Sequence, residues 1–172
     1  MVDDLADPRR VEPAFVLDER SMLEAWLEFH RTTLELKCEG LSAEQLKYRP
    51  VETSVLSLHG LVRHMAEVER GWFRRALSDE PELPRIWSTV HEADLDLFPL
   101  DDASWPEDFQ VWQYECALAR EAVLGFSLED AGVRNDEPCT LRWIYNHMIE
   151  EYARHNGHAD LIREMIDGAV GW

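Results

Sequence analysis

The chain has 172 residues, which is enough for one domain with a hydrophobic core but short for two. Hydrophobic residues make up 45% of it, and the mean hydropathy is −0.38, so the composition excludes both a disordered protein and an integral membrane protein. Seventeen Lys and Arg oppose 35 Asp and Glu, which gives a net charge of −18. Such a charge repels phosphate backbones and anionic lipids, so we expect neither a nucleic-acid nor a membrane partner.

The beginning of the chain, MVDDLADPRRVEP, lacks the basic and apolar regions of a secretion signal, so we expect a cytoplasmic protein. Three cysteines, Cys38, Cys116 and Cys139, stand at long spacings without a C-x-x-C motif. This pattern predicts reduced, packed thiols rather than disulfides or a thiolate zinc site.

Residues 1–20 contain Pro8 and Pro13 and show no sustained periodicity. We therefore expect them to form an N-terminal arm that lies on a single domain, residues 21–172.

The first helical pattern begins at Ser21 and ends at Gly40, with apolar residues at alternating spacings of four and three. After it, Ser42 stands three residues before Gln45, the spacing of a capping box. This spacing predicts a short helical turn that ends near Pro50.

Three further helices are expected, and the ranges predicted for them are 54–77, from about 107, and 140–167 before Gly168. The second and third are separated by a long acidic crossover that contains four prolines. No segment shows the sustained alternation of a strand, so we expect an all-α protein, a four-helix bundle with a long crossover between its second and third helices.

The fourth predicted helix carries the clearest chemical signal. Glu151 and His155 lie within its apolar stripe at positions i and i+4, so their side chains stand one above the other on one face. A buried carboxylate is costly unless it meets a cation, a proton or a cavity. The two residues therefore suit the binding of one metal ion.

The second predicted helix offers a partner, because His64 lies at the edge of its apolar arc. Together with Glu151 and His155 it would form a set of two histidines and one glutamate, which binds a divalent transition metal and leaves coordination positions open. The alternative is a metal-free core in which Glu151 is protonated or pairs with Arg154 or Arg63.

The other histidines are assigned weaker roles. His147 is an alternate ligand, and His158 is a fourth ligand or a group that orients His155. We expect His30 to be packed and His59 to lie on the surface, and His91 in the crossover is left unassigned.

The segments SVLSLHGLVRHMAEVERGWF and LRWIYNHMIEEYARHNGHADLIREMIDG resemble the DinB-like superfamily, close to the mycothiol-dependent maleylpyruvate isomerases. The resemblance covers nearly the whole chain, and E-x-x-x-H-N-G-H is its most specific part. It implies a bundle of up-down-down-up order with a metal held by His64, Glu151 and His155. The isomerases carry an additional C-terminal domain that this sequence lacks, so isomerisation of maleylpyruvate itself is not expected.

The resemblance also implies a mechanism, in which a thiol such as mycothiol is deprotonated at the open metal position and attacks a small electrophile. Zinc is the first expectation for the metal, with nickel, iron or manganese as alternatives. Arg154 and Asn156 flank the ligands and are candidates to orient them. No catalytic residue is assigned.

The sequence supports two hypotheses about function. The first is a metal-dependent, thiol-dependent transferase or isomerase. The second is a non-catalytic metal-binding or stress-related bundle that works through dimerisation or a partner protein. A homodimer is compatible with both hypotheses.

Two other features receive structural interpretations. The tryptophans at helical spacing, among them Trp72, Trp112 and Trp143, indicate a core or an interface more readily than a ligand pocket. The acidic crossover, with Asp96 and Asp101 among its acids, lacks the spacing of an EF-hand and is expected to be a solvated loop.

Overall fold

The computed structural model of the chain describes residues 7–78, 80–89, 93–98 and 100–170. It is mostly helical, as expected, and has a small two-stranded sheet. The main helices are α1 (Glu19–Cys38), α3 (Leu58–Glu69), α4 (Trp105–Ala122) and α5 (Leu141–Asp167).

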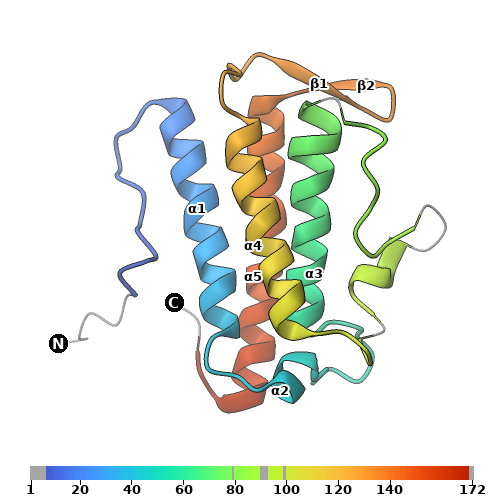
Figure 1. The fold of residues 1–172 in the computed structure, drawn as a ribbon. Helices are drawn as coiled ribbons and strands as arrows, with labels where there is room; N and C mark the ends of the chain where they lie inside the picture. The colour runs from blue at the N-terminus through green and yellow to red at the C-terminus, as the bar shows by residue number, and fades with distance from the viewer. Residues whose placement is uncertain (1–6, 79, 90–92, 99, 171–172) are drawn as a thin grey trace.

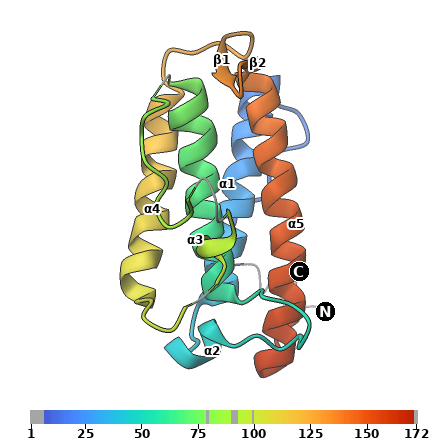
Figure 2. The ribbon, with the colours of Figure 1, turned by 90° about the vertical axis from the view of Figure 1, so that its right-hand side faces the viewer.

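The four main helices lie side by side (Figures 1 and 2). The most extensive packing joins α1 to α5 and α3 to α4, and α3 also packs against α5. In Figure 1, α1 and α5 run downward from the end that carries the sheet, whereas α3 and α4 run upward toward it. Helices α3 and α5 therefore pack antiparallel. The middle of α3 lies beside the middle of α5.

The ends of the helices follow local capping signals. The short α2 (Ala43–Lys47) carries the predicted capping box between Ser42 and Gln45. The Oγ1 atom of Thr140 accepts a hydrogen bond from the N–H of Trp143 at 3.2 Å and begins α5, and Gly168 ends it with φ of 80°.

The second predicted helix differs from its expected range in two ways. It begins at Leu58 rather than at residue 54, because the Oγ atom of Ser57 accepts a hydrogen bond from the N–H of Gly60 at 3.1 Å. It also changes its winding at its end, where η1 (Arg70–Leu77) continues α3 as a π-helix.

The expectation that the chain contains no strands is wrong. Strands β1 (Ala131–Arg134) and β2 (Glu137–Thr140) form an antiparallel hairpin in which Arg134 is opposite Glu137. Asn135 and Asp136 form its turn with φ of 51° and 65°, the left-handed values that such two-residue turns require. Strands of four residues are too short for alternation to be recognised in the sequence.

A charged network lies inside the hydrophobic core. The Arg31 Nε and Nη2 atoms donate to the two carboxylate oxygens of Glu69 at 2.7 and 2.5 Å. The hydroxyl of Tyr152 also donates to Glu69, at 2.7 Å, and accepts from the indole N–H of Trp112 at 3.0 Å. Because Glu69 is fully buried, these partners are what make its charge tolerable in the core.

The segments outside the main helices are held by charged side chains. The carboxylate oxygen Oε1 of Glu67 accepts hydrogen bonds from three consecutive backbone N–H groups of the crossover, at residues 86–88, with distances of 2.7 to 2.9 Å. The crossover then forms a single 3₁₀ turn, η2 (Ala93–Asp96). Before α1, Arg9 forms ion pairs with Glu35 and Glu39 of that helix.

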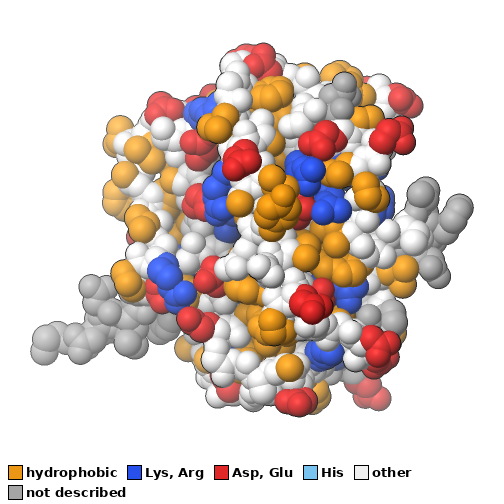
Figure 3. All heavy atoms as spheres, in the orientation of Figure 1, with side chains coloured by type: hydrophobic (Ala, Val, Ile, Leu, Met, Phe, Trp, Pro, Cys, Tyr) orange, Lys and Arg blue, Asp and Glu red, His pale blue; other side chains and the backbone are white. Residues whose placement is uncertain are grey.

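Acidic, basic and hydrophobic side chains are interspersed on the face shown in Figure 3. The net negative charge of the chain is therefore not gathered into a single acidic patch on that face.

Candidate metal centre

Three predicted site residues from two helices meet in the structure. His64 of α3 and Glu151 and His155 of α5 each offer one ligand atom, and these atoms all lie within 4.8 Å of one another. The His155 Nε2 atom is 3.3 Å from Glu151 Oε2, and the rings of His64 and His155 are 4.7 Å apart. The i, i+4 spacing aligns the pair on α5, and the packing of α3 against α5 supplies His64.

The cluster lies at the edge of the buried stripe of α5 rather than in its middle. The side chains of Glu151 and His155 keep 21% and 12% of their exposure, and that of His64 keeps 24%. The positions that follow them, Tyr152 and Asn156, are the buried ones. The cost of burying Glu151 is therefore smaller than the stripe predicts, and the cluster is accessible to solvent.

The surroundings of Glu151 favour its ionised form. The hydrogen bond with His155 lowers the pKa of Glu151, and the nearby imidazoles of His147 and His64 act in the same direction, whereas burial opposes them. An ionised carboxylate is the form that binds a metal.

Neither arginine considered as a partner of Glu151 contacts it. Arg63 donates to the carbonyl of Leu95 at 3.1 Å and stacks over Trp87, and exposed Arg154 pairs with Glu150. The ion pairs of Glu151 within the described part of the chain are with histidines alone.

Asp96 stands behind His64, which the sequence did not indicate. Its Oδ2 atom lies 2.8 Å from His64 Nδ1, and its Oδ1 atom accepts the N–H of Leu97 at 3.0 Å. Asp96 is 3% exposed, so the expectation of a solvated position is wrong for this residue. In the sequence, Asp96 is one of several acidic residues in a long loop, and nothing distinguishes it from the others. The path of the crossover brings it to α3.

His147 and His158 flank the cluster on α5. The Nε2 atom of His147 is 3.4 Å from Glu151 Oε1, and with Glu150 and Glu151 it makes a second group whose ligand atoms lie within 4.8 Å of one another. The Nδ1 atom of His158 is 3.4 Å from Nδ1 of His155, so it is placed to orient that ring. Burial and the neighbouring charges of His155 and Arg154 lower the pKa of His158.

Asn156 and His59 lie away from the cluster. The amide nitrogen of buried Asn156 donates to the carbonyl of His30 at 3.0 Å, which directs it toward α1 and away from the cluster. The expectation of a surface position for His59 is wrong, because it is fully buried and forms a hydrogen bond with Asp108 at 2.8 Å. His91 lies outside the described residues.

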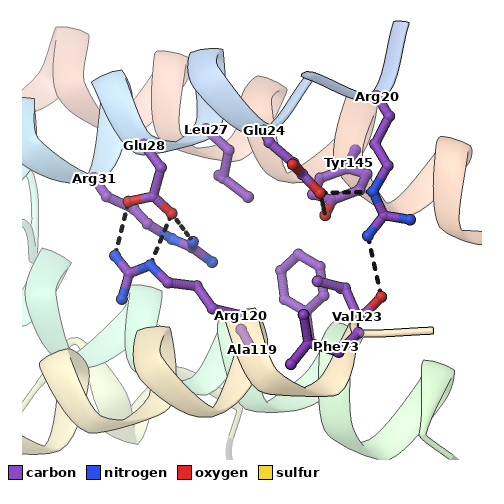
Figure 4. A pocket seen from close by; sticks show the side chains of 11 residues that line it. Arg20, Glu24, Leu27, Glu28, Arg31, Phe73, Ala119, Arg120, Val123 and Tyr145 are labelled. Atoms are coloured by element: carbon purple, nitrogen blue, oxygen red, sulfur yellow. Dashed lines mark hydrogen bonds and ion pairs between the residues drawn. The ribbon is translucent and has the colours of Figure 1, made fainter. Parts of the chain in front are cut away.

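A pocket of about 350 Å³ opens between α1 and α4, at a different corner of the bundle (Figure 4). Its charged groups are satisfied by one another, because Glu28 bridges Arg31 and Arg120, and Glu24 accepts from Arg20 and Tyr145. Neither His64, Glu151 nor His155 lines it, so the candidate metal centre and this pocket are separate features.

No helix within the described ranges is both long and apolar enough to cross a membrane. The helices and the cluster of two histidines and one glutamate together define a helical protein with a candidate metal centre.

The family model described as Mycothiol-S-transferase matches residues 22–168, and the chain belongs to this family. The match runs from α1 to the end of α5 and confirms the resemblance to DinB-like proteins that is seen in the sequence. Membership connects the chain with transfer reactions that involve the thiol mycothiol. No curated protein and no solved structure matches the chain.

Proposed function

We propose that this protein is a metal-dependent transferase that joins a mycothiol-type thiol to a small electrophile. The family supports the thiol and the class of reaction. The observation that carries the metal is the meeting of His64, Glu151 and His155 within 4.8 Å. We assign this function to residues 21–172, with the up-down-down-up order of a DinB-like bundle and with residues 1–20 as an arm.

The donor set fits a divalent transition metal, with zinc proposed first. Two imidazoles and one carboxylate supply three ligands and leave at least one position open for a small molecule. The contact with Asp96 places the proton of His64 on Nδ1, so that its Nε2 lone pair is available to a metal. In the same way, we propose that Nδ1 of His158 accepts a hydrogen bond from Nδ1–H of His155, while the Nε2 atom of His155 faces Glu151.

A bound divalent cation supplies positive charge that stabilises the thiolate form of a coordinated thiol near neutral pH. In the proposed transfer, the S–H bond breaks and its proton passes to water. A bond forms between sulfur and the electrophilic carbon, and the leaving group departs with its bonding electron pair. The carboxylate of Glu151 would lower the net positive charge of the site. His64 and His155 would hold the ion between α3 and α5.

Metal content tests this proposal first. Untagged wild type, His64→Ala, Glu151→Ala, His155→Ala and the matched control Glu150→Ala would be measured by elemental mass spectrometry. We expect about one metal ion per chain in the wild type and in Glu150→Ala, and a loss in the other three variants. Loss of the metal in Glu150→Ala with retention in His64→Ala would instead identify the group formed by His147, Glu150 and Glu151.

Thiol transfer is the second measurement. The metal-loaded protein would be incubated with mycothiol and monobromobimane, and the thioether product would be quantified against Glu151→Ala. We expect turnover that depends on the metal. Full metal occupancy without turnover for mycothiol and other low-molecular-weight thiols would refute the transferase and leave the non-catalytic metal-binding protein as the conclusion.

A further inference from the structure

A second pocket, of about 550 Å³, lies beside the hairpin, between η1 and the beginning of α5. Trp72 of η1 and Trp143 of α5 form its aromatic walls with ring centroids 5.0 Å apart, and Arg134, Cys139 and neighbouring hairpin residues complete it. Its volume is in the range of sites that bind small molecules. A separate aromatic pocket on this face was not the preferred interpretation of the tryptophans in the sequence.

A continuous row of side chains joins this pocket to the candidate metal centre. The ring of His147 stacks on Trp143 at 4.9 Å and meets the edge of Trp72 at 4.6 Å, and its Nε2 atom is 3.4 Å from Glu151. Trp143, His147 and Glu151 are spaced four residues apart on one face of α5. At 1.5 Å of rise per residue, Trp143 and Glu151 are about 12 Å apart along the helix axis, with His147 between them.

The far end of the pocket is basic. Arg134 also lines an adjoining hollow of about 150 Å³, together with Arg75 and Arg85. The guanidinium of Arg134 lies 3.9 Å over the ring of Trp72 and donates to the carbonyl of Gly71 at 3.1 Å. Burial and repulsion by Arg75 and Arg85 lower the pKa of Arg134, as expected where positive charges are gathered.

These three arginines have no carboxylate partner among the described residues, although the whole chain has a net charge of −18. Arg75 donates to the carbonyl of Pro81 at 3.4 Å, and its Nε atom is buried without a hydrogen-bond partner. Exposed Glu137 lines the aromatic pocket opposite Arg134 but forms no ion pair with it in the described structure. Donors arranged in this way are suited to a carboxylate or another oxyanion.

We propose that this pocket, lined by Trp72, Trp143 and Arg134, binds the electrophile together with the adjoining hollow that holds Arg75 and Arg85, and that the electrophile is a small carboxylate with a planar apolar body. Its carboxylate would lie against Arg134, Arg75 and Arg85, its apolar body against Trp72 and Trp143, and its reactive carbon toward Glu151. This inference rests on the proposed function, because it assigns the second substrate of the same reaction.

The test uses direct binding, so that it does not depend on metal or turnover. Isothermal titration calorimetry would compare 2-naphthoate with its neutral analogue 2-naphthylmethanol on the wild type, Arg134→Ala, Trp143→Ala, Glu151→Ala and the matched control Arg142→Ala. Arg142 precedes Trp143 but is paired with Glu19 and Glu129 outside the pocket. Circular dichroism would verify that each variant is folded, and Arg85→Ala in the crossover would replace Arg134→Ala if the hairpin does not form.

We expect the wild type to bind the acid about tenfold more tightly than the alcohol, as a charged hydrogen bond predicts. Arg134→Ala or Arg85→Ala should lose this preference. Trp143→Ala should lower the affinity for both compounds, and Arg142→Ala should leave both affinities unchanged. Equal affinity of the wild type for the two compounds, or an unchanged preference in both arginine variants, would overturn the inference. If Glu151→Ala loses metal and turnover but keeps the preference, the pocket stands by itself. If the pocket fails while the metal centre is active, the proposed function remains and its electrophile is not a planar acid.

Discussion

The Nδ1 atom of His64 lies 2.8 Å from Oδ2 of Asp96, across a sequence separation of 32 residues. The carboxylate is buried and its other oxygen is held by the backbone of Leu97, so its position is fixed. A carboxylate that accepts one N–H of a histidine directs the other ring nitrogen toward a metal and makes it a better ligand. Asp96 therefore connects the crossover to the candidate metal centre through its contact with His64.

We expect Asp96→Asn to weaken metal binding about tenfold, because an amide still accepts the hydrogen bond but lacks the charge that strengthens the ligand. Competition with a chromophoric chelator measures this change. Asp101→Asn, an exposed position in the same crossover, is the control and should bind metal as the wild type does. Equal affinities for both variants would show that Asp96 does not support His64.

The buried pair of Arg31 and Glu69 predicts a large effect on stability. Glu69→Gln keeps the shape of the side chain but leaves the guanidinium of Arg31 without its buried counter-charge, so the free energy of unfolding should fall by about 3–5 kcal/mol. Equilibrium unfolding in urea measures this change in the free energy of unfolding. Glu121→Gln on the exposed side of α4 should change stability by less than about 0.5 kcal/mol. A loss in Glu69→Gln as small as in this control would contradict the prediction.

Two glycines should respond to alanine in opposite directions. A Cβ atom at Gly132 would lie 2.0 Å from the carbonyl oxygen of Ala76, so Gly132→Ala must displace the hairpin from η1 and should cost about 1–3 kcal/mol or more. At Gly157 the same atom meets nothing within 4 Å, and alanine inside a helix should add about 0.5–1 kcal/mol. Thermal unfolding of the two variants provides the comparison, and a common sign would refute the packing described for the hairpin.

His30 predicts part of the pH dependence of stability. Burial lowers its pKa below the value of 6.5 that it has in an unfolded chain, so below that pH the unfolded state binds a proton that the folded state resists. Stability from His30 is present above pH 6.5 and is lost as the pH falls. In the presence of a chelator, the difference in unfolding free energy between pH 7.5 and 5.5 should be smaller for His30→Gln than for the wild type. An identical difference would show that His30 contributes nothing.

Much of the helical framework could be predicted from the sequence because its signals are local. The capping box at Ser42, the end of α5 at Gly168 and the i, i+4 spacing of Glu151 and His155 all depend on residues within one or two turns. Helix α3 begins at Leu58 rather than at residue 54, because Ser57 caps it by accepting a hydrogen bond from the N–H of Gly60, although the helical pattern begins earlier. The hairpin is not predicted because its strands have only four residues each and show no sustained alternation.

Local sequence patterns specify the helices and the residue types that are able to bind a metal. Which of these residues meet depends on how the segments pack: packing brings His64 to Glu151, places Asp96 behind His64 and buries His59 against Asp108. Helical periodicity specifies which face of each helix is apolar, but it does not specify the rotation and offset of one helix against another or the path of a long crossover. Those are fixed by side-chain packing between segments far apart in the chain, and this packing assembles the site.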